Sequence, residues 1–322
     1  MLSRIAESLF WIGRYVERAD DTARILDAVL SRLLEDPWAD EDRSCRLLLD
    51  SLGVPEPDAE ERVTSARALN TLAFDEASPT AIAGAWTAAR DNARGAREAV
   101  STEMWECLNT TWQALPSRRR AAERIGSYTY VAYVRERAAL LAGLAESTMS
   151  HDEGYQFLVL GRSLERLDMM TRLLSVQALD PVHGPSWTTL LRAAGAEGAY
   201  LRSFGANVTP QSAAEFLLLD RLFPRSAVAA LTDAEDALLD VDGLAGGADD
   251  ARRYARGPVT DPARRYIGQA RTRLEYADTG HLLAELPALL RSLQDAGARS
   301  SLAVTRRFFQ HGNAVQWAHE GV

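Results

Sequence analysis

The sequence predicts an all-α fold: a bundle of long helices built from two duplicated halves with pseudo-two-fold symmetry. Three observations support this prediction. Apolar residues recur at helical spacing along most of the chain, without the alternation typical of strands. Ser78-Pro79 is typical of a helix start, and Asp180-Pro181 of a helix end. A charged pattern, G-R-x-x-E-R-x-D-x-x-x-R, occurs as GRYVERADDTAR at 13–24 and as GRSLERLDMMTR at 161–172.

The expected helices follow from this periodicity in chain order. The first carries one copy of the charged pattern, and a long central helix carries the other. The glycine-rich segment 243–250 is expected to be an internal linker, and clear periodicity ends after Pro287. The expected spans are 2–34, 41–53, 58–73, 79–99, 102–115, 117–149, 152–179, 186–204, 210–222, 225–240 and 261–293.

Two weaker echoes accompany the charged pattern in the same order along the chain. One aligns Asp75 with Asp220 and Pro79 with Pro224, and the other shares I-G and L-L-A-x-L. Ordered echoes at nearly equal offsets indicate an internal duplication and not a solenoid of short units. The paired ranges are 72–85 with 217–230, and 125–144 with 267–286.

The duplication sets the expected domain organisation. We predict a single all-α domain over 1–293, with halves near 1–148 and 149–293. Residues 294–322 are expected to form a C-terminal tail of uncertain structure.

Composition excludes several classes of function. All 36 basic residues are arginine, so a Schiff-base, P-loop or kinase-type lysine cannot occur. The net charge of −9 argues against nucleic acid as the main partner. Cys45 and Cys107 lack metal-type spacing and suit a reducing compartment. Without an apolar run of ~18 residues, no membrane span is expected, and we predict a cytoplasmic protein.

The repeated pattern places charged side chains on a helix face with apolar flanks. Its glycine, glutamate, aspartate and last arginine share one stripe, and its first two arginines form the stripe beside it. A mid-helix glycine costs about 1 kcal/mol relative to alanine, and is best explained by close approach of another backbone. The first stripe holds Gly13, Glu17, Asp20 and Arg24 beside Arg14 and Arg18; the second holds Gly161, Glu165, Asp168 and Arg172 beside Arg162 and Arg166.

Two interpretations of these residues remain open. In the structural one, the two helices pack closely at their glycines, and arginines of one copy neutralise glutamates of the other. In the functional one, Glu17 and Glu165 act as catalytic bases, while four arginines bind a carboxylate or phosphate group of a substrate. Those arginines are Arg14, Arg18, Arg162 and Arg166.

A metal-dependent site is not expected. A carboxylate-bridged metal pair in a helix bundle needs two Glu-x-x-His motifs, and this chain offers only Asp278-x-x-His281. Nearby arginines would also repel a cation. We therefore predict neither a metal nor another cofactor.

The segments MLSRIAESLFWIGRYVERADDTARIL, FLVLGRSLERLDMMTRLL and EFLLLDRLFPRSAV resemble the bacterial alpha-E family, an all-helical domain of unknown function. The resemblance extends to about residue 293. Two departures are Asp21 after Asp20, where the family usually has a small or polar residue, and Leu167, where alanine is usual. The matching positions are Glu7, Arg14, Glu17, Arg18, Arg162, Glu165, Arg166, Asp220, Pro224 and Arg225.

The resemblance also implies a context. Alpha-E proteins occur beside or fused to circularly permuted ATP-grasp proteins, which implies such a protein as the partner and a role in making or modifying peptide-like amides. Because this chain lacks lysine, the nucleotide step would belong to the partner. The Arg/Glu pocket would then bind a carboxylated or phosphorylated intermediate, from a peptide or an acidic small molecule. The alternative is a non-catalytic helical scaffold or docking protein.

Overall fold

The computed structural model describes residues 1–55, 58, 60–179, 185–256 and 259–309, and every regular element in these ranges is helical. The all-α prediction is therefore confirmed for the described chain. No described helix combines the length and apolar character needed to cross a membrane.

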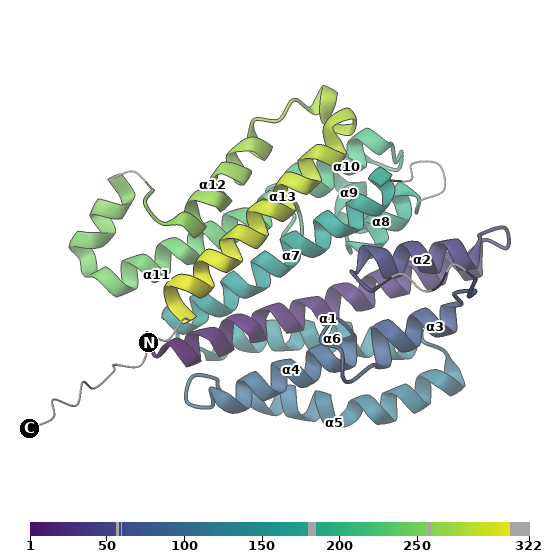
Figure 1. Ribbon diagram of the computed structural model, residues 1–322, viewed down its shortest axis with the longest axis horizontal. Helices are drawn as coiled ribbons and strands as arrows, with labels where there is room; N and C mark the ends of the chain where they lie inside the picture. Colours follow the sequence, from purple (N-terminus) through teal and green to yellow (C-terminus); the bar gives the residue numbers. More distant parts are fainter. Residues whose placement is uncertain (56–57, 59, 180–184, 257–258, 310–322) are drawn as a thin grey trace, which may run out of the picture.

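Two long helices form the centre of the molecule, α1 (Ser3–Glu35) and α7 (Glu153–Leu179). They lie side by side and run in the same direction (Figure 1). The amino group of Met1 lies 2.9 Å from Glu153 at their starts. The parallel arrangement brings the two copies of the charged pattern face to face.

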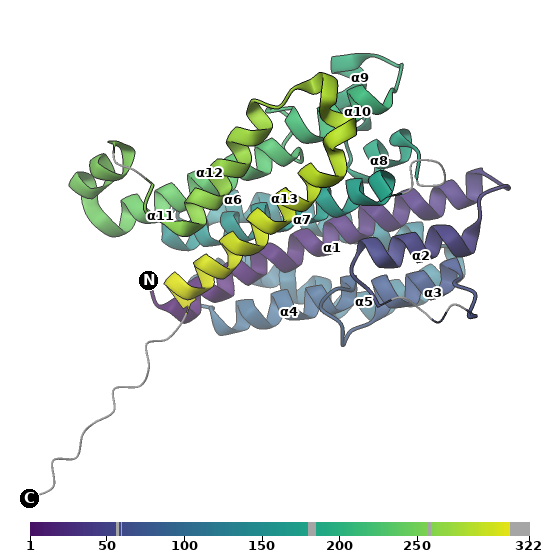
Figure 2. The same ribbon diagram turned by 45° about the horizontal axis from the view of Figure 1, so that its top comes forward.

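The other helices surround this pair in two groups. The helices between α1 and α7 cover one side of α1, and those after α7 cover the far side of α7 (Figures 1 and 2). The first group is α2 (Glu41–Ser51), α3 (Ser65–Leu69), the π-helix η1 (Asn70–Phe74), α4 (Ile82–Gly95), α5 (Thr102–Ile125) and α6 (Tyr128–Thr148). The second is α8 (Trp187–Ala193), α9 (Glu197–Phe204), α10 (Pro210–Leu219), α11 (Ala227–Arg256), α12 (Pro262–Glu275), the 3₁₀-helix η2 (Thr279–His281), α13 (Leu282–Val304) and the π-helix η3 (Thr305–Phe309).

Side-chain caps start several of these helices. Asp40, Ser101, Thr209 and Asp261 each accept a hydrogen bond from a backbone N–H three residues later. Such caps satisfy backbone donors that a helix start otherwise leaves free. They fix where the shorter helices begin against the central pair.

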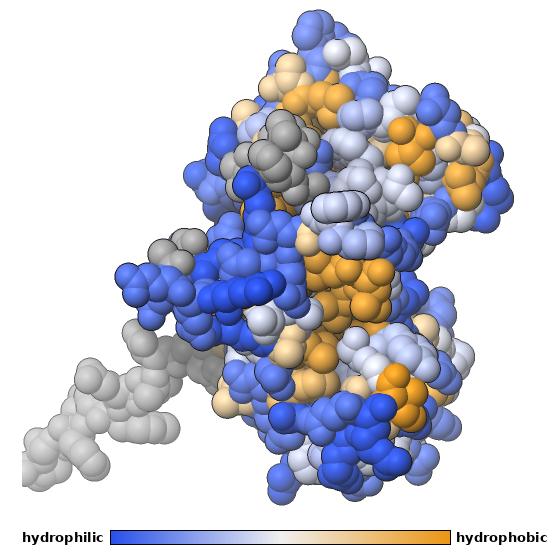
Figure 3. Space-filling view, turned by 90° about the vertical axis from the view of Figure 1, so that its right-hand side faces the viewer, coloured by the Kyte–Doolittle hydropathy of each residue, from blue (hydrophilic) through white to orange (hydrophobic). Residues whose placement is uncertain are grey.

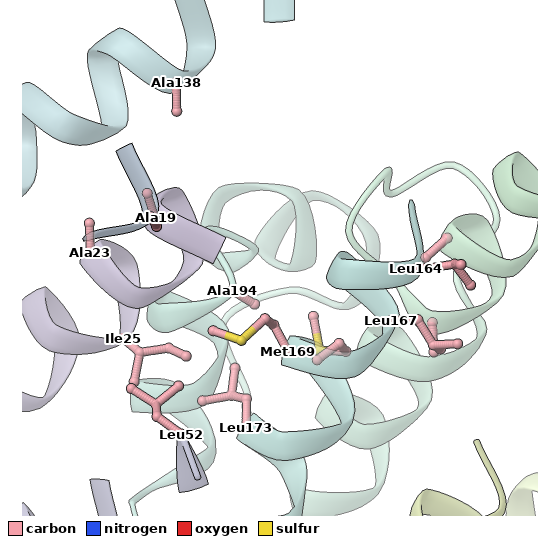
Figure 4. Packing of buried hydrophobic residues seen from close by; sticks show 14 of the residues in the cluster. Ala19, Ala23, Ile25, Leu52, Ala138, Leu164, Leu167, Met169, Leu173 and Ala194 are labelled. Atoms are coloured by element: carbon pink, nitrogen blue, oxygen red, sulfur yellow. The ribbon is translucent and has the colours of Figure 1, made fainter. Parts of the chain in front are cut away.

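The core consists of aliphatic and aromatic side chains between the helices. Near the end of the central pair, Ile25 and Leu52 meet Leu173, with Met169 and Ala194 beside them (Figure 4). On the face that includes the α2 end, hydrophobic surface lies in a hollow between the two groups of helices (Figure 3).

Some predicted helix limits were wrong. Pro116 lies inside α5, which continues to Ile125 and ends at Gly126, where φ is +132°. Residues 243–250 belong to α11 and do not form a linker. The helix expected over 261–293 is two helices, α12 and α13, and that expected over 186–204 is α8 and α9.

The end of the described chain also differs from expectation. Helix α13 continues to Val304 and η3 to Phe309, so 294–309 is helical. The Phe309 ring packs 5.4 Å from Phe10 and 5.8 Å from Phe157, measured between centroids. These residues thus belong to the folded bundle. The rest of the expected tail, 310–322, lies outside the described residues.

Candidate functional site at the contact of α1 and α7

The two central helices touch at their glycines. A Cβ atom added to Gly13 would overlap the carbonyl oxygen of Leu158, and one added to Gly161 would overlap that of Phe10. Both obstacles are backbone atoms, which cannot move aside as a flexible side chain can. The predicted close approach at Gly13 and Gly161 is confirmed.

Glu165 is bound by two arginines of α1. Arg14 donates from Nε to Oε2 over 2.6 Å, and Arg18 donates from Nε to Oε1 over 2.5 Å and from Nη2 to Oε2 over 3.0 Å. The Glu165 side chain is only 1% exposed. Burial alone would raise its pKa, but the charges of Arg14 and Arg18 prevail and lower it.

Glu17 of α1 is bound by an arginine of α7 and by Arg225. Arg166 donates from Nε to Oε1 over 2.7 Å and from Nη2 to Oε2 over 3.0 Å, and Nη1 of Arg225 lies 3.0 Å from Oε1. Burial opposes ionisation, yet Arg166 and Arg225 lower the pKa of Glu17 to about 2. Arginines of each copy thus neutralise the glutamate of the other, as predicted. We call these two arrangements the Glu165 clamp and the Glu17 clamp.

Each clamp also anchors the start of a neighbouring helix. Arg18 donates to the carbonyl of Pro79 over 3.3 Å, ahead of α4, and Arg166 donates to that of Pro224 over 2.9 Å, ahead of α11.

In each of these two turns, an aspartate that precedes the proline accepts a hydrogen bond from a backbone N–H two residues later. Asp75 accepts from Ala77 and Asp220 from Leu222, both over 2.9 Å. The clamps therefore connect the α1–α7 contact to the helices packed on each side.

Arg225 also organises an acidic cluster that sequence reasoning missed. It pairs with Asp20 and Asp21 as well as Glu17, and carboxylate oxygens of these three residues lie within 4.8 Å of one another. Burial, together with the charges of Glu17 and Asp20, raises the pKa of Asp21 to about 7, although Arg225 opposes the shift. Arg225 faces all three carboxylates, but Oδ1 of Asp20 is buried and accepts no hydrogen bond from the described residues.

The candidate residues do not share one pocket. Arg14 and Arg18 are committed to Glu165, and Arg166 to Glu17. A cavity beside Glu17 is lined by Arg162 and Arg166, whereas Arg14 lines a separate cavity next to α13. Arg162 joins neither clamp. The expected single pocket of two glutamates and four arginines is instead two clamps and one arginine outside them.

The family model for Alpha-E, described as "a predicted alpha-helical domain with a conserved ER motif", matches residues 1–309. The chain belongs to the Alpha-E family. Two Glu-Arg pairs of this Alpha-E protein, Glu17-Arg18 and Glu165-Arg166, form the centre of the two clamps. The match also extends past residue 293, in agreement with the helical structure of 294–309.

Similar curated proteins are longer than this chain. Uncharacterized proteins of Mycobacterium tuberculosis and Mycobacterium bovis are 25% identical over 93% of the Alpha-E chain but only 35% of their own length. The chain thus spans about a third of the relatives it matches. No solved structure matches it significantly.

The raised pKa of Asp21 should make the stability of the folded protein depend on pH. The folded protein holds a proton on Asp21 up to about pH 7, whereas the unfolded chain releases it near 3.8. Protons favour the folded state in this window, so Asp21 lowers the free energy of unfolding as pH rises from about 4 to 7. Asp21→Asn should remove this pH dependence. Between pH 5 and 8, the free energy of unfolding of the variant should therefore rise by about 1–4 kcal/mol relative to that of the wild type.

Urea unfolding at pH 5, 6, 7 and 8 measures the difference in slope, in which changes from other titrating groups cancel. The lowered pKa of Glu17 acts below pH 4.5 and does not interfere. Parallel curves for wild type and Asp21→Asn would contradict the prediction.

Proposed function

We propose that this Alpha-E protein is a non-catalytic helical component that acts with an ATP-grasp-type ligase in making or modifying peptide-like amides. The non-catalytic assignment follows from the burial, the arginine partners and the ionisation of Glu17 and Glu165. Each is buried, bound by two arginines, and ionised well below neutral pH. The clamps then serve to hold α1 against α7 and to orient the surrounding helices.

A general base must reach the proton that it removes, and its pKa should lie near the working pH. With a pKa of about 2, Glu17 is a very weak base, and both of its carboxylate oxygens already accept hydrogen bonds. Burial would raise the pKa of Glu165, but Arg14 and Arg18 lower it, and both of its carboxylate oxygens accept hydrogen bonds from these arginines. We therefore assign Glu17 and Glu165 to structure, in place of the catalytic roles expected from the sequence.

The ligase partnership rests on different support. The chain has no lysine to bind nucleotide phosphates, so activation of a carboxylate by ATP would need another protein. The mycobacterial relatives have about two thirds of their length outside the matched part, which leaves room for such a unit in the same chain. The family resemblance supplies its class, a circularly permuted ATP-grasp protein.

We further infer that the two helix groups arose by duplication. The Arg18–Pro79 contact repeats as Arg166–Pro224, at the positions that the sequence echo aligns. The third echo lends no support, because Gly126 ends a helix whereas Gly268 lies inside α12. The support therefore comes from the clamps and the turns they anchor.

Reconstitution with a purified circularly permuted ATP-grasp protein tests the proposal. We expect a stable complex in size-exclusion chromatography, and ATP consumption by the partner that increases when this chain is added. Glu17→Gln should keep that stimulation per folded molecule, because glutamine can still accept from Arg166 and no proton transfer is lost. Arg202→Gln, an exposed single-charge change, is the matched control.

Two outcomes would contradict the proposal. Absence of any complex or stimulation removes the partnership. A Glu17→Gln variant with wild-type stability and at least a hundredfold loss of the joint reaction would restore Glu17 as a catalytic base.

A further inference from the structure

Arg162 is the exception among the arginines of the repeated pattern. Arg14, Arg18 and Arg166 each donate to a glutamate, whereas Arg162 makes no hydrogen bond or ion pair with any described side chain. Its Nε atom is buried and without a partner in the described structure. A buried donor atom without a partner is costly, even on a side chain that is only partly buried as Arg162 is, so its persistence needs an explanation.

A sequence difference between the turns at Pro79 and Pro224 explains why Arg162 has no partner. In the echo that aligns Pro79 with Pro224, the next residue is Thr80 in the first half and Arg225 in the second. Arg225 binds Glu17 and takes the place that Arg14 has on Glu165. Arg162, the counterpart of Arg14, is left beside the Glu17 clamp without a partner of its own.

Arg162 lines a cavity of about 110 Å³ between α1, α6 and α7. Gly13, Glu17 and Arg166 line the same cavity. Its lining on α6 is aliphatic, and Ala138 there points toward the part of α1 that carries Ala19 and Ala23 (Figure 4). The aliphatic wall on α6 consists of Ala138, Ala139, Leu141, Ala142 and Ala145.

We propose that this cavity binds a small aliphatic monocarboxylate, with its carboxylate on Arg162 and its short chain against α6. A guanidinium group offers Nε and Nη donors in the fork that a carboxylate accepts. Because Arg225 already binds Glu17, the carboxylate of the ligand would be the partner of Arg162. This site goes beyond the proposed function and does not depend on the ligase partner.

Charge and wall chemistry select the ligand class. Glu17 and Asp20 lie on the lining, and Asp233 is close enough for its pKa to respond to Arg162. On the same lining, Arg24 pairs with Asp20, and Arg166 and Arg225 pair with Glu17, so among the described residues Arg162 is the one lining arginine without a paired carboxylate. A single negative charge matches Arg162, whereas phosphate near neutral pH brings a second one. The α6 wall offers a short alkyl chain an apolar surface and gives a phosphate group nothing to bind.

Butyrate is the probe, and the purified chain alone is the sample. We expect butyrate to raise the melting temperature and to broaden its own carboxyl-¹³C resonance, and phosphate at equal ionic strength to do neither. Arg162→Gln should weaken butyrate binding at least tenfold while leaving the melting temperature of the unliganded protein unchanged or higher. Arg202→Gln, which removes one exposed positive charge elsewhere, should bind butyrate as wild type does.

A second variant keeps Arg162 and closes the cavity. Ala142 is exposed and lines the cavity, so Ala142→Phe should block butyrate without disturbing either clamp. Four results would each overturn the proposal: no butyrate binding to wild type, equal binding by Arg162→Gln, unimpaired binding by Ala142→Phe, or phosphate binding as tight as butyrate binding.

Discussion

Glu165→Ala is expected to lower the free energy of unfolding by about 3–5 kcal/mol, the usual cost of removing one partner of a buried ion pair. The Glu165 side chain is 1% exposed, and Arg14 and Arg18 are 14% and 19% exposed. Truncation leaves two guanidinium groups facing each other in a space that water reaches poorly. Their repulsion adds to the lost hydrogen bonds, and Arg18 also becomes a weaker anchor for the turn at Pro79.

Urea melts of Glu165→Ala and Glu98→Ala provide the comparison. Glu98 pairs with Arg4 at 3.5 Å, but both side chains are more than half exposed, so its truncation should cost no more than about 1 kcal/mol. Glu165→Gln should fall between the two, because it keeps an acceptor and removes only the charge. A loss below about 1 kcal/mol for Glu165→Ala would mean that water already hydrates the arginines and that the clamp contributes little.

The fold could be predicted from sequence wherever local signals agreed. Helical periodicity located α1 and α7 within one residue at each end. Apolar flanks required the charged faces to be buried, and burial required the charges to pair. The glycines then indicated which helices would touch. Each step used either a short window of residues or the comparison of two such windows, 13–24 and 161–172.

The errors arose where tertiary contacts override local signals. Pro116 predicts a helix break, yet α5 passes through it, because packing against α4 and α6 holds the helix together. Segment 243–250 has the glycine content of a linker but continues α11. Helix propensity is a weak prior in both places.

The site could be predicted only in part for a similar reason. The Glu and Arg residues of the pattern lie on two helices, and their cross-pairing follows from close packing. Arg225 lies in a turn far along the chain, and nothing local places it on Glu17, Asp20 and Asp21. The one available signal was the alignment of Thr80 with Arg225, a charge difference between otherwise similar turns. That difference also separates Arg162 from the other arginines.

Gly161→Ala should destabilise the protein, although alanine is the better helix former. In an exposed helix this change gains up to about 1 kcal/mol. Here the new methyl group would overlap the carbonyl oxygen of Phe10, a backbone atom of α1. The helices must separate, which lengthens the hydrogen bonds of both clamps, so we expect a net loss of about 1–3 kcal/mol or more, as in overpacked cores.

Gly143→Ala is the matched control, because this glycine lies inside α6 with no atom within 4 Å of the added Cβ. The same substitution should therefore raise stability at Gly143 and lower it at Gly161, and the opposite signs identify backbone contact as the cause. Circular dichroism melts of the two variants and of the double variant measure both effects. If Gly161→Ala is as stable as Gly143→Ala, α1 and α7 do not touch at that point. The clamps would then have to hold two helices that are already apart, and the cross-pairing of Glu17 and Glu165 would lose its structural cause.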